Sequence, residues 1–136
     1  SALDGNDDAY LLARIVQLYT PGIPQVYYVG LLAGTTDIES VKSLKDPRSG
    51  NRHNYTKAEI DERVHYPMLE RMYEVMRFRN TYPAFDGQIE IDEAAENGIL
   101  GVTWRKEKYM TTLRTDFRTN KYRITYLDEN GTVNIL

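Results

Sequence analysis

The chain has 136 residues, of which 41% are hydrophobic, and a formal net charge of −3 from 17 basic and 20 acidic residues. This length predicts one domain or two small ones, and the mixed charges exclude the long basic block that would attract nucleic acid or an anionic membrane. The absence of cysteine excludes disulfides and thiolate metal sites and fits a reducing, cytoplasmic location. No apolar run is long enough to span a bilayer, and the acidic first ten residues do not form a secretory signal.

A helix followed directly by a strand is predicted at the start of the chain. Apolar residues recur at helical spacing over residues 7–20, with Asp7 or Asp8 as the cap and Pro21 as the stop signal. The next segment, residues 23–30, is short, β-branched and aromatic, which predicts a buried strand. A helix, a tight turn and an apolar strand form one half of an α/β repeat.

A long polar segment, residues 31–55, follows the predicted strand. Loops of this length in compact domains are functional or disordered. A short helix is expected at residues 37–43, and the spacing of Asp37 and Glu39 favours capping of this helix over a catalytic carboxylate pair. The stretch Thr56–Glu59 has the spacing of a capping box, which predicts a helix from Lys57.

The last helix and a β module complete the chain. Pro67 suits the first position of a helix with an apolar face of Leu and Met residues, and Pro83 ends it. From Phe85 the pattern changes to about five short, partly alternating segments with turn signals between them, which predicts an antiparallel β module. These segments read GQIEID, GILGVTWR, KYMTTLRTD, KYRITYL and TVNIL.

Several stretches together resemble the sucrose phosphorylases of the α-amylase superfamily. The stretch GIPQVYYVG is similar to the last-strand motif of that superfamily and by itself marks only the superfamily. Taken together with LLAGTTD and GNRHNYTKAEID, it resembles the sucrose phosphorylases more specifically. The resemblance implies that residues 1–84 are the C-terminal part of a (β/α)₈ TIM barrel, its last αβα units, and that residues 85–136 are a small antiparallel C-terminal β domain. The fold class is then α/β plus all-β.

The resemblance also implies an enzyme class. Such enzymes convert sucrose and phosphate to α-glucose 1-phosphate and fructose by double displacement with retention, without cofactor or metal. Their catalytic carboxylates lie on earlier barrel strands, so the isolated chain is expected to lack them and to be inactive. Related enzymes act instead on sucrose 6-phosphate or glucosylglycerate, and both alternatives stay open.

Two loop residues are the candidates for substrate binding. The resemblance implies that Arg52 holds hydroxyls of the glucosyl ring, and a planar guanidinium offers the fixed donors that this role needs. His53 is the second candidate, although a lone loop histidine is more often a hydrogen-bonded structural residue, and this structural role is the favoured interpretation. A metal role is disfavoured because His65, the other histidine, lacks the close helical spacing of ligands.

A reading from a different class is a non-catalytic module that binds sugar or forms oligomers. Most of the barrel that would cover the apolar helix faces is expected to lie outside the chain. The fragment should then leave an apolar patch, which predicts self-association as a homo-oligomer or docking to the missing barrel.

Overall fold

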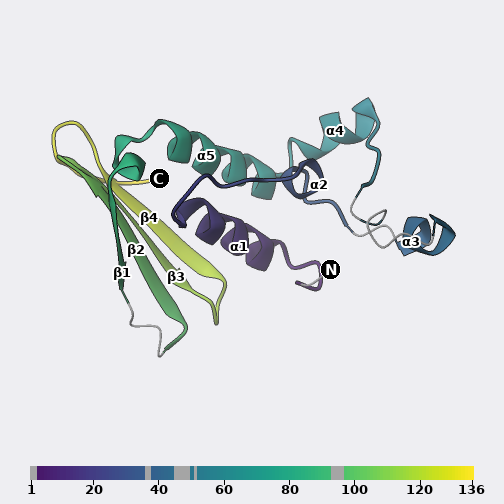
Figure 1. The fold of residues 1–136 in the computed structure, drawn as a ribbon, viewed down its shortest axis with the longest axis horizontal. Helices are drawn as coiled ribbons and strands as arrows, with labels where there is room; N and C mark the ends of the chain where they lie inside the picture. Colours follow the sequence, from purple (N-terminus) through teal and green to yellow (C-terminus); the bar gives the residue numbers. More distant parts are fainter. Residues whose placement is uncertain (1–2, 36–37, 45–49, 51, 93–96) are drawn as a thin grey trace.

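The computed structural model describes residues 3–35, 38–44, 50, 52–92 and 97–136. Along this part of the chain, helices come first and an antiparallel sheet follows (Figure 1). The two longer helices, α1 and α5, lie side by side against the sheet, and the shorter helices α2, α3 and α4 lie beyond the helix ends farthest from it. The fold is therefore one sheet with a layer of two helices and a small helical extension.

The sheet confirms the predicted five-strand β module. Its strands follow one another in the order β1-β2-β3-β4-β5, each antiparallel to the next, as tight turns between short strands require. Alternation along the strands directs Val102, Trp104, Leu113 and Ile124 to the covered face. The strands are β1 (Gln88–Asp92), β2 (Ile99–Lys106), β3 (Tyr109–Asp116), β4 (Lys121–Leu127) and β5 (Val133–Ile135).

The two longer helices also confirm their predicted spans. Helix α1 (Asp7–Tyr19) ends before Pro21, and α5 (Pro67–Thr81) begins with its proline and ends before Pro83, after which the 3-10 helix η2 (Pro83–Asp86) leads into the sheet. The predicted cap of α1 is wrong by one residue. Asn6 caps this helix, since its side-chain oxygen accepts the amide of Ala9 at 2.9 Å.

One apolar core joins both halves of the chain. It contains residues of α1, α5, η2 and strands β2 to β4, and the predicted division between residues 1–84 and 85–136 therefore crosses a shared core. The division itself stays a prediction. The buried members of the core are Leu11, Ile15, Leu18, Tyr19, Leu69, Met72, Val75, Ala84, Phe85, Val102, Trp104, Leu113 and Ile124.

Two buried hydrogen bonds connect α1 to the sheet within this core. The hydroxyl groups of Tyr19 and Thr111 lie 2.8 Å apart, and the indole Nε1 of Trp104 donates to the carbonyl of Tyr19 at 2.8 Å. Burial raises the pKa of Tyr19 above its ordinary range, so this phenol stays a donor. These bonds fix the end of α1 on the sheet and satisfy polar groups that burial would otherwise penalise.

The predicted strand over residues 23–30 is wrong in this structure. Residues 21–27 have no regular structure, and the last part of the predicted strand is the short helix α2 (Tyr28–Leu31). A strand needs a neighbour for its backbone hydrogen bonds, and no strand lies beside this segment in the described part of the chain. Instead of being buried, Ile23 is 98% exposed.

The helical extension contains two further short helices. Helix α3 (Ile38–Leu44) confirms the short helix expected near residues 37–43, whereas Asp37, one of its two expected capping residues, lies outside the described residues. Helix α4 (Lys57–Arg63) starts at the predicted capping box of Thr56 and Glu59. The segment with the two candidate binding residues lies directly before α4.

Candidate functional site

Arg52 lies on the surface next to α2. Its side chain is exposed, and its positive charge acts on the phenol of Tyr28. Desolvation and the neighbouring Tyr27 raise the pKa of Tyr28, and the charge of Arg52 opposes this rise. The guanidinium is therefore close to the end of the segment that the sequence predicted as a strand, and it faces solvent.

His53 is held by the helix cap that follows it. Its Nε2 lies 3.5 Å from the Oε1 of Glu59. The other carboxylate oxygen of Glu59 accepts the amide of Thr56 at 2.7 Å and the hydroxyl of Thr56 at 2.8 Å. The backbone hydrogen bond from Thr56 is the main reason that the pKa of Glu59 is lowered. These contacts favour the structural role for His53, although its predicted substrate contact stays a prediction.

Tyr55 is the centre of this region, and the sequence analysis did not identify it. Its ring meets His53 and Tyr28 edge to face, with centroids 4.6 Å and 6.3 Å away. The guanidinium carbon of Arg63 lies 5.6 Å from the centroid of the same ring. Partial burial raises the pKa of Tyr55, and the charge of Arg63 opposes this rise.

Tyr28, the first residue of α2, and Tyr27, directly before it, complete the site. The rings of Tyr27 and Tyr28 pack with centroids 4.5 Å apart, and the side chains are 54% and 38% exposed. Tyrosine rings with free polar edges are suited to the apolar and hydroxyl faces of sugars. The site thus combines an exposed arginine, a histidine and exposed aromatic rings, which fits recognition of a neutral polyhydroxyl ligand rather than chemistry on it.

Exposed apolar residues lie around the same extension. Self-association or docking through them stays a prediction. The large hydrophobic side chains exposed in this part of the chain are Tyr27, Tyr28, Ile60 and Tyr66. Ile23 is also exposed, but it lies near Phe85 and Trp104 at the sheet.

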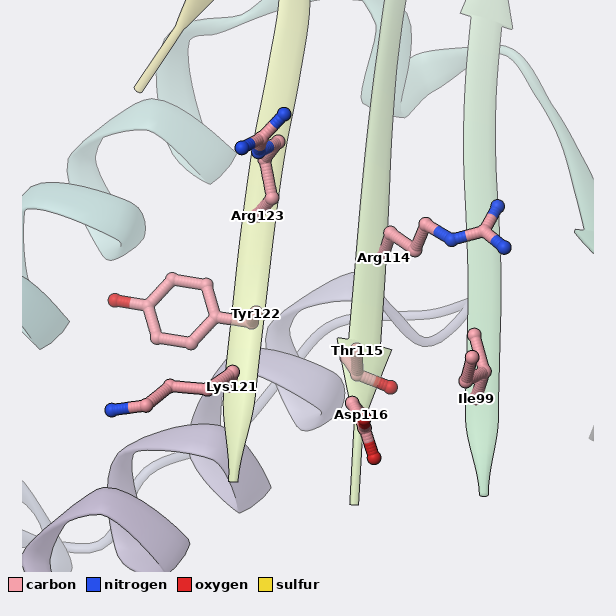
Figure 2. A pocket seen from close by; sticks show the side chains of 7 residues that line it. All are labelled: Ile99, Arg114, Thr115, Asp116, Lys121, Tyr122 and Arg123. Atoms are coloured by element: carbon pink, nitrogen blue, oxygen red, sulfur yellow. The ribbon is translucent and has the colours of Figure 1, made fainter. Parts of the chain in front are cut away.

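A separate pocket of about 350 Å³ lies on the sheet and contains none of the predicted site residues (Figure 2). Arg114 and Arg123 face each other in the register of β3 and β4, and in Figure 2 Arg114 reaches toward β2 while Arg123 stays over its own strand. Asp116, which also lines the pocket, pairs with Arg118, whose Nε and Nη2 donate to its two carboxylate oxygens at 3.0 Å and 2.9 Å. The pocket is lined by Ile99, Arg114, Thr115, Asp116, Lys121, Tyr122 and Arg123.

The described residues contain neither a metal-ligand cluster nor a membrane-spanning helix. No group of three or more His, Cys, Asp or Glu side chains is placed to hold a metal ion there. None of the helices in that part of the chain has the length and apolar character needed to cross a membrane.

Comparison with known proteins gives a consistent set of relatives. No protein-family profile matches the chain. It is 49% identical to a sucrose 6(F)-phosphate phosphorylase of Thermoanaerobacterium thermosaccharolyticum over 96% of the chain and 27% of the relative. It is 43% identical to a glucosylglycerol phosphorylase of Marinobacter adhaerens over 93% of the chain and 26% of the relative. It is also 43% identical to a sucrose phosphorylase of Bifidobacterium adolescentis over 83% of the chain and 22% of the relative.

A solved structure agrees with these sequence matches. The crystal structure of the sucrose 6F-phosphate phosphorylase from Thermoanaerobacter thermosaccharolyticum superposes with a TM-score of 0.93 at 46% identity. The superposition covers 99% of this chain and 27% of that one. The chain therefore spans about a quarter of the length of the relatives that it matches.

Proposed function

We propose that the whole protein transfers a glucosyl unit to phosphate with retention. The premise is that this chain is homologous to a C-terminal portion of sucrose phosphorylases and related phosphorylases. In this proposal a nucleophilic carboxylate attacks the glucosyl carbon of sucrose, a carboxylic acid protonates the departing fructose, and phosphate then takes the glucosyl unit to give α-glucose 1-phosphate. Both carboxyl groups would come from the preceding chain. The similarity over nearly the whole chain to proteins named as phosphorylases is the observation that carries the proposal.

The part of this chain in the proposed reaction is substrate binding. Arg52 would hold hydroxyls of the glucosyl ring, because its planar fork of N–H donors suits vicinal hydroxyls. Among the described residues, other arginines such as Arg79 are occupied by backbone carbonyls. The exposure of Arg52 next to Tyr28 supports this role, since the donor must be reachable from solvent. His53, whose Nε2 lies 3.5 Å from Glu59, would contribute a second polar contact at most.

The proposed domain organisation explains the irregular segment before α2. Residues 1–84 would complete a (β/α)₈ barrel, and residues 85–136 would form the β domain that follows it. In the complete barrel, residues 21–27 would pair with strands of the preceding chain. The backbone of Tyr27, with φ −72° and ψ 150°, is already extended.

Sucrose 6F-phosphate is the second candidate donor. One relative at 49% identity and the solved structure with a TM-score of 0.93 both carry the name of a sucrose 6F-phosphate phosphorylase. A panel of sucrose, sucrose 6F-phosphate, glucosylglycerol and glucosylglycerate, each with inorganic phosphate and the full-length protein, decides between the donors. We expect glucose 1-phosphate from at least one of them, and release from none would refute the proposed function.

The role of Arg52 is tested in the same full-length protein. Arg52→Lys keeps the charge but loses the planar fork, so we expect kcat/KM for the donor to fall by about tenfold or more while the protein stays folded. Arg77→Lys changes an exposed arginine on α5 and should leave kcat/KM unchanged. Near wild-type kcat/KM in Arg52→Lys would remove this residue from the site. The isolated 136-residue chain should release no glucose 1-phosphate.

A further inference from the structure

We infer that Tyr55 is a positioning residue for Arg52. Its ring packs residues 52–56 against α2 and the turn that follows it, and this contact keeps the guanidinium of Arg52 beside Tyr28. The catalytic relevance of this inference rests on the proposed role of Arg52, whereas the positioning itself can be tested without any activity.

The ring of Tyr55 is held from several sides by residues of other segments. Tyr28 lies against it from α2, with ring planes at 88°, and Arg63 lies over it from α4. Arg63 is itself fixed, because its Nη1 donates to the carbonyl of Leu32 at 3.1 Å and to that of Ala33 at 3.4 Å. The same guanidinium thus contacts Tyr55 and the end of α2, and so connects the two segments.

The hydroxyl of Tyr55 occupies space that only a glycine leaves open. A Cβ atom at Gly34 would overlap this hydroxyl and would lie 2.7 Å from the Cγ1 of Val29. The amide of Gly34 donates to the carbonyl of Val29 at 2.7 Å, so the backbone here cannot move away without losing that bond. Gly34 is therefore required by close packing rather than by an unusual backbone angle.

The helix cap alone is a weaker restraint on Arg52. His53 and Glu59 are 36% and 44% exposed at their side chains, and exposed pairs of this kind contribute little. Tyr55 combines ring packing with the contact at Gly34 and lies only three residues from Arg52. Three residues span at most about 10 Å, so a fixed Tyr55 limits how far Arg52 can move.

A double-mutant cycle in the full-length protein tests the inference by kinetics. We expect Tyr55→Ala to lower kcat/KM for the donor about tenfold, mainly through KM, and Tyr55→Phe, which keeps the ring, to stay within about twofold of wild type. In an Arg52→Ala background, Tyr55→Ala should cause less than about a twofold further loss, because the residue that it positions is gone. Multiplicative losses in the double variant would overturn the inference and indicate a general structural role.

Limited proteolysis gives a second readout that does not depend on activity. Trypsin cleavage after Arg52, followed by mass spectrometry, should be several-fold faster in Tyr55→Ala than in wild type. It should be unchanged in the control Tyr66→Ala, which changes an exposed tyrosine. Gly34→Ala should also speed this cleavage, and adding Tyr55→Phe should partly restore protection, since it removes the overlapping hydroxyl.

The two readouts separate the possible failures. Unchanged cleavage after Arg52 in Tyr55→Ala would refute the positioning itself, whatever the activity. Faster cleavage in a full-length protein that releases no glucose 1-phosphate from any donor would refute the proposed function and leave the positioning of Arg52 by Tyr55 intact.

Discussion

The hydrogen bond between Tyr19 and Thr111 gives the sharpest test of how α1 is attached to the sheet. The hydroxyl of Thr111 donates to the carbonyl of Thr125 at 2.9 Å, so the phenol of Tyr19 must be the donor in its own bond to Thr111. Both side chains are fully buried. Removing the acceptor and removing the donor should therefore have unequal effects on the free energy of unfolding.

The expected sizes follow from which groups lose their partners. Thr111→Val leaves the O–H of Tyr19 buried without an acceptor and removes the donor to Thr125, so we expect a loss of about 2–3 kcal/mol. Tyr19→Phe removes only a donor, and the remaining hydroxyl of Thr111 keeps its own acceptor, so the expected loss is about 1 kcal/mol. In the double variant no unpaired phenol remains, and its loss should be smaller than the sum of the two by about 1–2 kcal/mol.

Urea unfolding followed by circular dichroism measures these free energies. The matched control is Thr112→Val on the opposite face of β3, where the hydroxyl pairs with Thr103 at 2.9 Å and is partly exposed. Its loss should be below about 1 kcal/mol. Equal losses for the variants at positions 111 and 112, or additive losses at positions 19 and 111, would refute the reasoning that burial decides the cost.

Two further variants test charged contacts. Arg79 donates from Nε to the carbonyl of Leu18 at 2.8 Å and lies over two aromatic rings. Arg79→Met should therefore lower the free energy of unfolding by about 1–2 kcal/mol, a value that allows for solvent screening of this half-exposed group. The control Arg77→Met, at an exposed position, should change the free energy of unfolding by less than about 0.5 kcal/mol. Equal effects in urea unfolding would contradict this. The guanidinium of Arg118 lowers the pKa of Asp116 to about 2, so its stabilising effect is complete above the ordinary aspartate pKa of about 3.9 and disappears as the pH falls through about 2. Asp116→Asn should thus lower the thermal midpoint at pH 7 but not at a pH below 2, and a loss that is the same at both pH values would argue against the ion pair.

Local sequence signals were reliable where a structure depends on neighbours in the chain. The capping box of Thr56 and Glu59 and the prolines at both limits of α5 act within one or two helical turns, so their patterns predicted the helices directly. The five strands were predictable for the same reason, because short turns pair each strand with the next one in the chain.

The candidate site was only partly visible in the sequence. Arg52 and His53 were identified through the resemblance to phosphorylases, since nothing in the composition of a polar loop separates a binding arginine from a solvated one. Tyr55 and Gly34 were missed as a pair, because their contact joins positions 21 residues apart through a loop.

The sequence alone therefore determined the helices, the meander of strands and the kinship with phosphorylases, since these depend on periodicity, turn residues and motif identity. Only the tertiary structure decided that residues 23–30 are not a strand here and that Tyr19, Thr111 and Trp104 join α1 to the sheet. Strand pairing and side-chain packing are contacts between distant parts of a chain, and no local pattern records whether the partner for such a contact is present.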